Sequence, residues 1–207
     1  MQKLDMPPTK SSLRRVKEHL AFAYEGFDLL NQKRELLVME LMKHVKTTRN
    51  TEERLRAAVL GLYAAYRIAA VDAGSAVVRR KAAATPRRFV LQRRQARFMG
   101  IALPVWSCRI KRPRVTANLV GTTAALDRVR SEGMELIATL TAYATAAKAV
   151  LLLSRELQKV QRRVNALEKI HIPQNEDTRK YIMDRLEEME REEVFVKKVI
   201  QRRADQR

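Results

Sequence analysis

Residues 13–41 read LRRVKEHLAFAYEGFDLLNQKRELLVMEL, and apolar positions recur along them at alternating spacings of three and four. This heptad spacing puts about one side chain per turn on a single stripe of an α-helix, where the stripe can pack against a second helix. Eight of the nine stripe positions are apolar. The nine are Leu13, Val16, Leu20, Ala23, Phe27, Leu30, Arg34, Leu37 and Leu41. The stretch therefore predicts a long helix that packs lengthwise against another helix.

The same stripe continues beyond residue 41 with one interruption. It is polar from His44 to Thr51, so we expect a soft spot or a shift of register there. A proline inside a helix costs about 3 kcal/mol or more, and none occurs between Thr9 and Thr85. With Thr9 or Ser11 as the cap, the sequence predicts one helix over residues 9–83. Its later stripe positions are Leu55, Ala58, Leu62, Ala65 and Ala69.

A second proline-free stretch predicts the partner helix, over residues 121–205. Its stronger heptad row is Val129, Leu136, Tyr143, Val150, Leu157 and Val164, and its weaker row is Leu126, Gly133, Leu140, Ala147, Ser154 and Gln161. The residue before a proline is disfavoured in the α region. Ile172-Pro173 therefore predicts a kink near Pro173, with a helix continuing behind it through Ile182, Leu186, Met189, Val196 and Ile200.

These two helices are expected to pair with each other. If the chain folds back about its middle, residues whose numbers sum to about 200 face one another. The basic set Arg14, Arg15 and Lys17 then approaches the acidic set Glu187, Glu188 and Glu190. The Ala-rich stretch 57–70 approaches residues 131–143, where small side chains permit close contact. The predicted fold class is all-α: a long antiparallel two-helix coiled coil with a short irregular or β-hairpin middle segment, forming one elongated domain.

The predicted middle segment, residues 84–120, is part of a strongly basic region. Residues 79–114 carry 12 Lys and Arg and no Asp or Glu. Phe89-Val90-Leu91 and residues 101–106 have the composition of short strands, which suggests a small hairpin. Clustered cations can bind a phosphate backbone, with Phe89, Phe98 or Trp106 as stacking groups. A solvated basic cap that contacts a protein explains the same residues.

Composition limits the possible classes of protein. The net charge of +19 predicts an acidic partner. The single Cys108 cannot form an intrachain disulfide, which favours a reducing compartment. No uninterrupted apolar run approaches the roughly 20 residues of a membrane span, so we expect a soluble or peripheral protein.

No constellation of catalytic or metal-binding residues stands out. The chain has neither a G-x-x-x-x-G-K-[ST] loop nor a G-x-G-x-x-G motif. His44 and His171 fall on stripe positions and are expected to be buried or half-buried structural residues. Cys108 has no Cys or His nearby at zinc spacing. The acidic run 187–193 is interleaved with arginine and predicts a solvated, ion-paired face.

Four segments in order along the chain match motifs of one known family. They are residues 8–17 (PTKSSLRRVK) leading to 27–37 (FDLLNQKRELL), residues 99–104 (MGIALP), residues 162–168 (RRVNALE) followed by Ile172-Pro173, and Tyr181-Ile182 followed by the acidic run 187–193. Together they resemble the D subunit of the V-type and archaeal-type (V/A-type) rotary ATPases and ATP synthases. The resemblance covers nearly the whole chain.

The resemblance implies a central-stalk rotor subunit that binds no nucleotide, needs no cofactor and is not itself an enzyme. Its implied partners are the catalytic and non-catalytic subunits of a hexamer, a small companion stalk subunit and a membrane-ring adaptor subunit. It would be cytoplasmic and peripheral to the membrane. Expected hexamer contacts are Arg14, Arg15, Arg202, Arg203 and Arg207. Expected stalk or ring contacts are Met99, Gly100, Ile101, Leu103 and Pro104.

Two other classes remain open at the level of sequence. A basic coiled-coil protein that binds nucleic acid predicts steeply salt-dependent binding to DNA or RNA. A scaffold coiled coil predicts a concentration-dependent homodimer, whereas a stalk protein predicts a monomer that recruits a distinct small partner.

Overall fold

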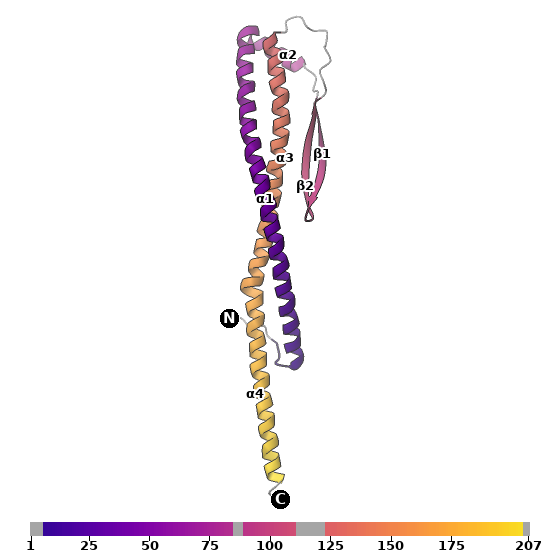
Figure 1. Ribbon diagram of the computed structural model, residues 1–207, viewed down its shortest axis with the longest axis vertical. Coiled ribbons are helices and arrows are strands. Elements are labelled where there is room, and N and C mark those ends of the chain that lie inside the picture. The colour runs from indigo at the N-terminus through magenta and orange to yellow at the C-terminus, as the bar shows by residue number, and fades with distance from the viewer. Residues whose placement is uncertain (1–5, 85–88, 111–122, 205–207) are drawn as a thin grey trace. The chain divides into compact units, whose positions relative to one another are not determined.

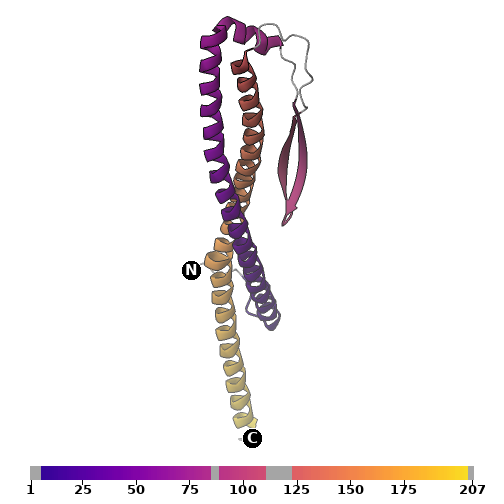
Figure 2. The same ribbon diagram turned by 45° about the horizontal axis from the view of Figure 1, so that its top comes forward.

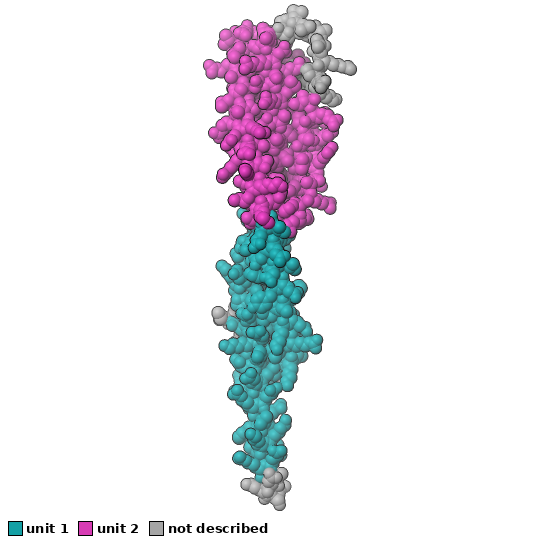
Figure 3. Space-filling view, viewed as in Figure 1, with its two compact units in different colours: residues 1–36, 157–207 teal, residues 37–156 magenta. Residues whose placement is uncertain are grey.

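The computed structural model describes residues 6–84, 89–110 and 123–204 (Figure 1). Its chain divides into two compact units, unit 1 (Met1–Leu36 with Leu157–Arg207) and unit 2 (Leu37–Glu156), which Figure 3 distinguishes by colour. The predicted single elongated domain stays a prediction. The elements in chain order are α1 (Lys10–Ala73), α2 (Ser75–Ala84), β1 (Phe89–Phe98), β2 (Ile101–Ile110), α3 (Ala124–Ala166), a π-helical turn (Leu167–His171) and α4 (Ile172–Ala204).

The first residues of α1 are held by the predicted cap. The Ser12 N–H donates to Thr9 Oγ1 at 3.2 Å, and the Thr9 hydroxyl also lies 2.8 Å from Ser12 Oγ. The first N–H groups of a helix have no partner within the helix. The Thr9 side chain supplies one, and α1 therefore begins at Lys10.

In unit 1 the start of α1 runs antiparallel to α4. Lys10 Nζ lies 3.0 Å from Glu190 Oε1, and the Tyr24 hydroxyl donates to Glu176 Oε1 at 2.6 Å. Moving forward along α1 thus moves backward along α4. In both pairs the residue numbers sum to 200, which confirms the predicted register for this unit.

The core of unit 1 forms where the two stripes meet. Val16, Leu20 and Ile182 are almost fully buried against one another. Full burial of such a side chain stabilises the folded state by about 1.5–3 kcal/mol. The cluster is covered by half-buried apolar side chains, namely Met6, Leu13, Tyr181 and Leu186.

In unit 2 the later part of α1 lies alongside α3 (Figures 1 and 2). A Cβ on Gly61 would lie 2.9 Å from Glu132 Oε2, and one on Gly133 would lie 4.0 Å from the Leu62 side chain. This confirms that the Ala-rich stretch 57–70 lies beside residues 131–143, as predicted. The buried residues of the two helices are Leu37, Ala65 and Ala69 from α1 and Thr141, Ala146, Ala149 and Leu153 from α3. The predicted fold class, antiparallel helices with a β-hairpin between them, is confirmed.

The buried stripe of α3 agrees with the predicted one at Val164 and differs from it elsewhere. Ala146, Ala149 and Leu153 each stand one position before a predicted stripe residue, and Val160 does the same. Predicted Leu140 is 50% exposed. Alanine and leucine occur on every side of this stretch, so the sequence gives little contrast between its faces. Close packing favours burial of the row with small side chains, because these side chains let the two helix backbones approach.

The predicted helix over residues 9–83 is interrupted at Gly74. This glycine has φ +81°, and α2 leaves it bent by 113° from α1. A positive φ costs an ordinary L-residue about 1–2 kcal/mol, whereas glycine adopts it freely. The absence of proline made the stretch look continuous, but one glycine is sufficient to end the helix.

Pro173 does not break the helix in which it lies. Ile172 has φ −66° and ψ −54°, within the α region that we expected it to leave. Its N–H bonds to the Leu167 carbonyl, five residues back, and closes the π-helical turn. A proline ring in an α-helix clashes with the carbonyl four residues earlier. One extra residue in the preceding turn shifts that carbonyl, so the chain stays helical. The insertion also turns His171 outward, where it is exposed rather than buried.

Glycine substitutions test this account of the helix interior and of the bend. A Cβ at Gly26 would meet nothing within 4 Å, so Gly26→Ala should raise the free energy of unfolding by about 0.5–1 kcal/mol. Gly74→Ala should lower it by about 1 kcal/mol, because alanine is strained at the positive φ of that residue. Urea midpoints measure both effects. Shifts of the same sign in the two variants would contradict the proposed role of Gly74.

The helical stretch from Ala124 to Arg202 contains an 18-residue window with a mean hydropathy of 1.7, of which 17% is buried. By length and composition alone such a window could cross a membrane, although the sequence suggested no such run. Core helices of soluble proteins meet the same criterion, and Ala146, Ala149 and Leu153 of this stretch are buried in unit 2.

Candidate interaction surfaces

The middle of the chain folds into a hairpin of two ten-residue strands. β1 pairs antiparallel with β2 in unbroken register, from Phe89 opposite Ile110 to Phe98 opposite Ile101. The connection is Met99-Gly100, with φ values of +47° and +82°. Two-residue turns of type I′ need positive φ at both positions, which is common for glycine and unusual for methionine. The first two residues of the MGIALP motif therefore form the turn.

The hairpin lies alongside α3 with β2 on the side of the helix (Figure 1). The Trp106 N–H donates to Thr145 Oγ1 of α3 at 3.0 Å, and the same hydroxyl lies 3.3 Å from the Trp106 carbonyl. Leu103 is only 6% exposed. Its side chain therefore packs within unit 2, whereas Met99 at the turn is 40% exposed. Of the predicted stalk or ring contacts, Ile101 and Pro104 are half-buried and Gly100 is exposed.

The last part of α4 carries a group of exposed apolar side chains. Lys10, the first residue of α1, contacts Glu190. The residues of α4 after Glu190 therefore extend past the N-terminus of α1. Apolar side chains in this segment are 50–69% exposed: Val194, Phe195, Val196 and Ile200. Exposed apolar clusters mark surfaces for binding other molecules. The heptad pattern predicts Val196 and Ile200 as stripe residues. It does not show that α1 begins at Lys10, opposite Glu190, so that α1 does not extend alongside these two residues.

The predicted hexamer contacts do not form one cluster. Arg14 is 83% exposed at its side chain and pairs with Glu18 of its own helix, Nε to Oε1 at 2.9 Å. Arg15 and Arg202 are exposed. Arg202 is twelve residues beyond Glu190, a distance of about 18 Å along α4 at the rise of an α-helix. Arg207, and the side chain of Arg203, lie outside the described residues.

Ion pairs on unit 1 form mainly along single helices. Arg14, expected to face the acidic set, pairs within α1, while Arg185 bonds to Glu188 at 2.7 Å within α4. Lys10 makes the contact across the helices, and its hydrogen bond to Glu190, together with the negative charge of that residue, raises the pKa of the ammonium group. Exposed pairs of this kind contribute little to stability, because water and salt screen the charges.

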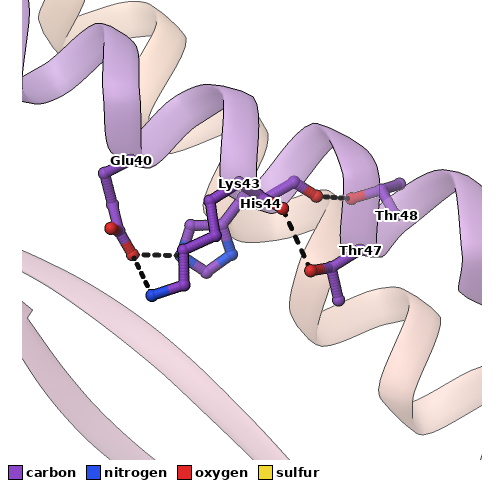
Figure 4. A network of polar contacts seen from close by, with 5 residues as sticks. All are labelled: Glu40, Lys43, His44, Thr47 and Thr48. Atoms are coloured by element: carbon purple, nitrogen blue, oxygen red, sulfur yellow. Dashed lines mark hydrogen bonds and ion pairs between the residues drawn. The ribbon is translucent and has the colours of Figure 1, made fainter.

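The predicted soft spot of α1 is helical and carries a local polar network (Figure 4). His44 Nε2 lies 3.2 Å from Glu40 Oε1, and Lys43 Nζ lies 3.6 Å from the same oxygen. The hydroxyls of Thr47 and Thr48 donate to the carbonyls of Lys43 and His44. Such bonds satisfy polar groups within one turn and often bend the helix slightly. His44 is half-buried, as predicted.

Within the described ranges, no group of three or more His, Cys, Asp or Glu side chains could hold a metal ion. Cys108 is a free thiol, half-buried on β2. The described surface is thus one of helix faces, a hairpin and exposed charge, suited to contacts with other macromolecules.

Comparison with known proteins identifies the family. The family model for the ATP synthase D subunit matches residues 12–202. The chain belongs to the ATP synthase D-subunit family. The A-type ATP synthase D subunit of Methanosphaera stadtmanae is 30% identical, with 100% of this chain and 98% of the relative aligned. The second V-type ATP synthase D subunit of Treponema pallidum is 34% identical (98% and 97%), and the V-type ATP synthase D subunit of Thermotoga neapolitana is 31% identical (93% and 95%).

Membership of the D-subunit family confirms the resemblance found in the sequence, and the structure gives its motifs physical roles. Residues 99–104 form the hairpin turn and the start of β2. Residues 162–168 end α3 and enter the π-helical turn that accommodates Pro173. One feature of the chain was missed in the sequence, namely the exposed apolar end of α4 past Glu190. It depends on where α1 begins, which no local pattern reports.

The contact between Tyr24 and Glu176 predicts a measurable titration. The hydrogen bond to Glu176 and the negative charge of its carboxylate favour the neutral phenol, which raises the pKa of Tyr24 above 10.0. Its contribution to stability is therefore present below pH 10 and is lost as pH rises through the raised pKa. Difference absorbance of tyrosinate should show a lower midpoint in Glu176→Gln, with no change in Glu25→Gln. Identical curves for Glu176→Gln and the parent chain would exclude the contact in solution.

Proposed function

We propose that this protein is the central-stalk rotor subunit of a V/A-type rotary ATPase. In this role it transmits torque between a nucleotide-hydrolysing hexamer and a membrane ring that translocates ions. It carries no catalytic residue itself and is held at the membrane only through the complex, on the cytoplasmic side. Membership of the D-subunit family supports the assignment to an ATP synthase, and the geometry of unit 1 supports the finer role.

The observation that carries the proposal is the free end of α4. Past Glu190, this helix exposes an apolar group together with Lys198 and Arg202. Arg191 and Lys197 pair with Glu187 and Glu193 of the same helix. A shaft that turns inside a cavity needs apolar contact that excludes water and charges that attract without fixing one angle. Exposed charge attraction is long-ranged and weak, so it is compatible with rotation. Arg202, with Arg203 and Arg207, would face acidic groups of the hexamer, and Arg14 and Arg15 would do so from α1.

The paired helices suit the transmission of torque. A two-stranded coil resists bending more than a single helix, because bending must disturb the packed stripe. The π-helical turn Leu167–His171 interrupts the regular helical surface of unit 1. One asymmetric rotor can then meet differently shaped neighbours in turn as it rotates.

The hairpin region of unit 2 would make a separate contact. Met99 and Gly100 form an exposed turn, with Ile101 and Pro104 half-buried behind it. We assign the turn to contact with the companion stalk subunit or the ring adaptor. Leu103 supports that surface from beneath, since it is buried in unit 2.

A tagged pull-down in mild detergent tests the proposal. The expected result is co-purification of a nucleotide-hydrolysing hexamer, a small stalk subunit and a ring adaptor, with the chain itself monomeric when isolated. A stable homodimer without these partners would instead favour a scaffold. Tight binding to DNA or RNA that falls steeply with salt would favour the nucleic-acid function.

A further inference from the structure

β1 is an edge strand whose outer side pairs with no other strand in the described part of the chain. It has ten residues, contains no proline or glycine, and pairs with β2 without a bulge. Every residue from Phe89 to Arg97 is exposed. Natural edge strands are usually short, bulged, charged or interrupted by proline, because open backbone groups attract a further strand. Of these protections β1 has only charge.

The register shows which backbone groups of β1 point to the open side. Trp106 is opposite Arg93, yet its N–H donates to Thr145 on α3, so this pair does not exchange backbone hydrogen bonds. Such pairs alternate with bonded ones along an antiparallel ladder, and their N–H and C=O groups point away from the partner strand. Gln95 is opposite Pro104. Proline has no N–H to donate to Gln95, so this pair also exchanges no backbone hydrogen bonds. The residues with outward backbone groups are Phe89, Leu91, Arg93, Gln95 and Arg97.

The side chains at this edge are cationic. Arg93 and Arg97 share one face of the strand and Arg94 lies on the other, and neither strand contains an acidic residue. The Arg93 guanidinium lies 6.0 Å from the centre of the Trp106 ring, which orients it over the same face. Two copies of β1 would place arginines against arginines, so the charge opposes self-pairing. The same charge favours an acidic strand.

We propose that the open edge of β1 accepts an extended acidic segment of a neighbouring protein as a third strand. Strand addition uses backbone hydrogen bonds for affinity and alternate side chains for specificity. Acidic residues four positions apart in the segment would face Arg93 and Arg97. A nucleic acid could meet the charges, but it lacks the alternating amide donors and carbonyl acceptors that the edge requires. The proposal does not depend on the rotor function.

The test uses the full chain and a capped ten-residue peptide of alternating glutamate and valine, labelled for fluorescence anisotropy. The control peptide replaces each valine by proline, which keeps the charge and prevents strand formation. We expect the first peptide to bind and the second to bind at least about tenfold more weakly, since several backbone hydrogen bonds are lost. Hydrogen exchange of the amides of Arg93, Gln95 and Arg97 should slow when the first peptide binds.

Two variants separate backbone pairing from charge. Gln95→Pro removes an outward N–H while sparing the ladder to β2 and should weaken binding about tenfold, through the lost bond and the added ring. Arg93→Gln with Arg97→Gln should weaken it several-fold at low salt, whereas Arg109→Gln on β2 should change it less than about twofold. Circular dichroism checks that Gln95→Pro is folded, and the exchange data on the unmodified chain decide the matter if it is not.

Four results with the unmodified chain would overturn the proposal. They are absence of binding, equal binding of both peptides, amide exchange in β1 that the peptide leaves unchanged, and displacement of the peptide by a single-stranded oligonucleotide that binds more tightly. Equal binding by the parent chain and a folded Gln95→Pro variant would also overturn it, because charge alone would then explain the contact.

Discussion

Ile182→Ala is expected to lower the free energy of unfolding of unit 1 by about 2–5 kcal/mol. Ile182 is 0% exposed and packs against Val16 and Leu20 at the contact between α1 and α4. The change removes buried methyl and methylene groups and leaves a cavity that two straight helices cannot easily close. Urea unfolding followed by far-UV circular dichroism measures the loss.

Met183→Ala is the matched control. Met183 is the next residue on α4 and is 38% exposed, so its truncation should cost under about 1 kcal/mol. Equal losses in the two variants would mean that Ile182 does not pack against α1 in solution. The register of unit 1 would then be wrong.

Removal of residues 191–207 is expected to abolish most ATP-driven ion transport in the assembled complex, if the chain is the rotor proposed above. The deletion takes away the exposed apolar group around Phe195 and the terminal arginines, but none of the buried core of unit 1. Loss of a central apolar anchor costs an interface at least about 2 kcal/mol, or roughly thirtyfold in affinity. Ion uptake into vesicles, compared with the rate of ATP hydrolysis, measures the coupling.

A shorter deletion distinguishes the two parts of this segment. Removing residues 201–207 takes away Arg202, Arg203 and Arg207 but keeps Phe195 and Ile200. A partial loss that shrinks as salt concentration rises is expected, because salt screens the charge attraction that the deletion removes and leaves the apolar contact in place. Normal coupling in the longer deletion would rule out any role for the end of α4 in torque transmission.

The sequence predicted α1 better than α3, for a physical reason. Large apolar and charged residues alternate clearly along α1, and all of its buried residues lie on the predicted rows, apart from the polar Ser12 beside the cap. In α3 the run from Ile137 to Leu153 is rich in alanine on all sides. Small side chains contribute little to the hydrophobic pattern but determine how closely two backbones approach. The buried row therefore depends on the partner helix.

The hairpin was predicted in place but shorter than it is. Residues 92–97 read QRRQAR, which has no strand pattern by itself. Pairing with β2 extends the strand through these residues, since context overrides propensity in sheets. The candidate contact surfaces were harder to predict. Arg14 and Arg202 were chosen by charge alone, and burial of Leu103 or exposure of Phe195 requires knowledge of the neighbouring elements.

The π-helical turn also constrains how the sequence can change over evolution. The extra residue in Leu167–His171 and the ring of Pro173 accommodate each other, because the widened turn moves the carbonyl that the ring would strike. A homologue that loses one residue in this turn would regain a regular ladder and could not keep the proline without a clash. The insertion and the proline should therefore be inherited as a pair, acquired together and lost together.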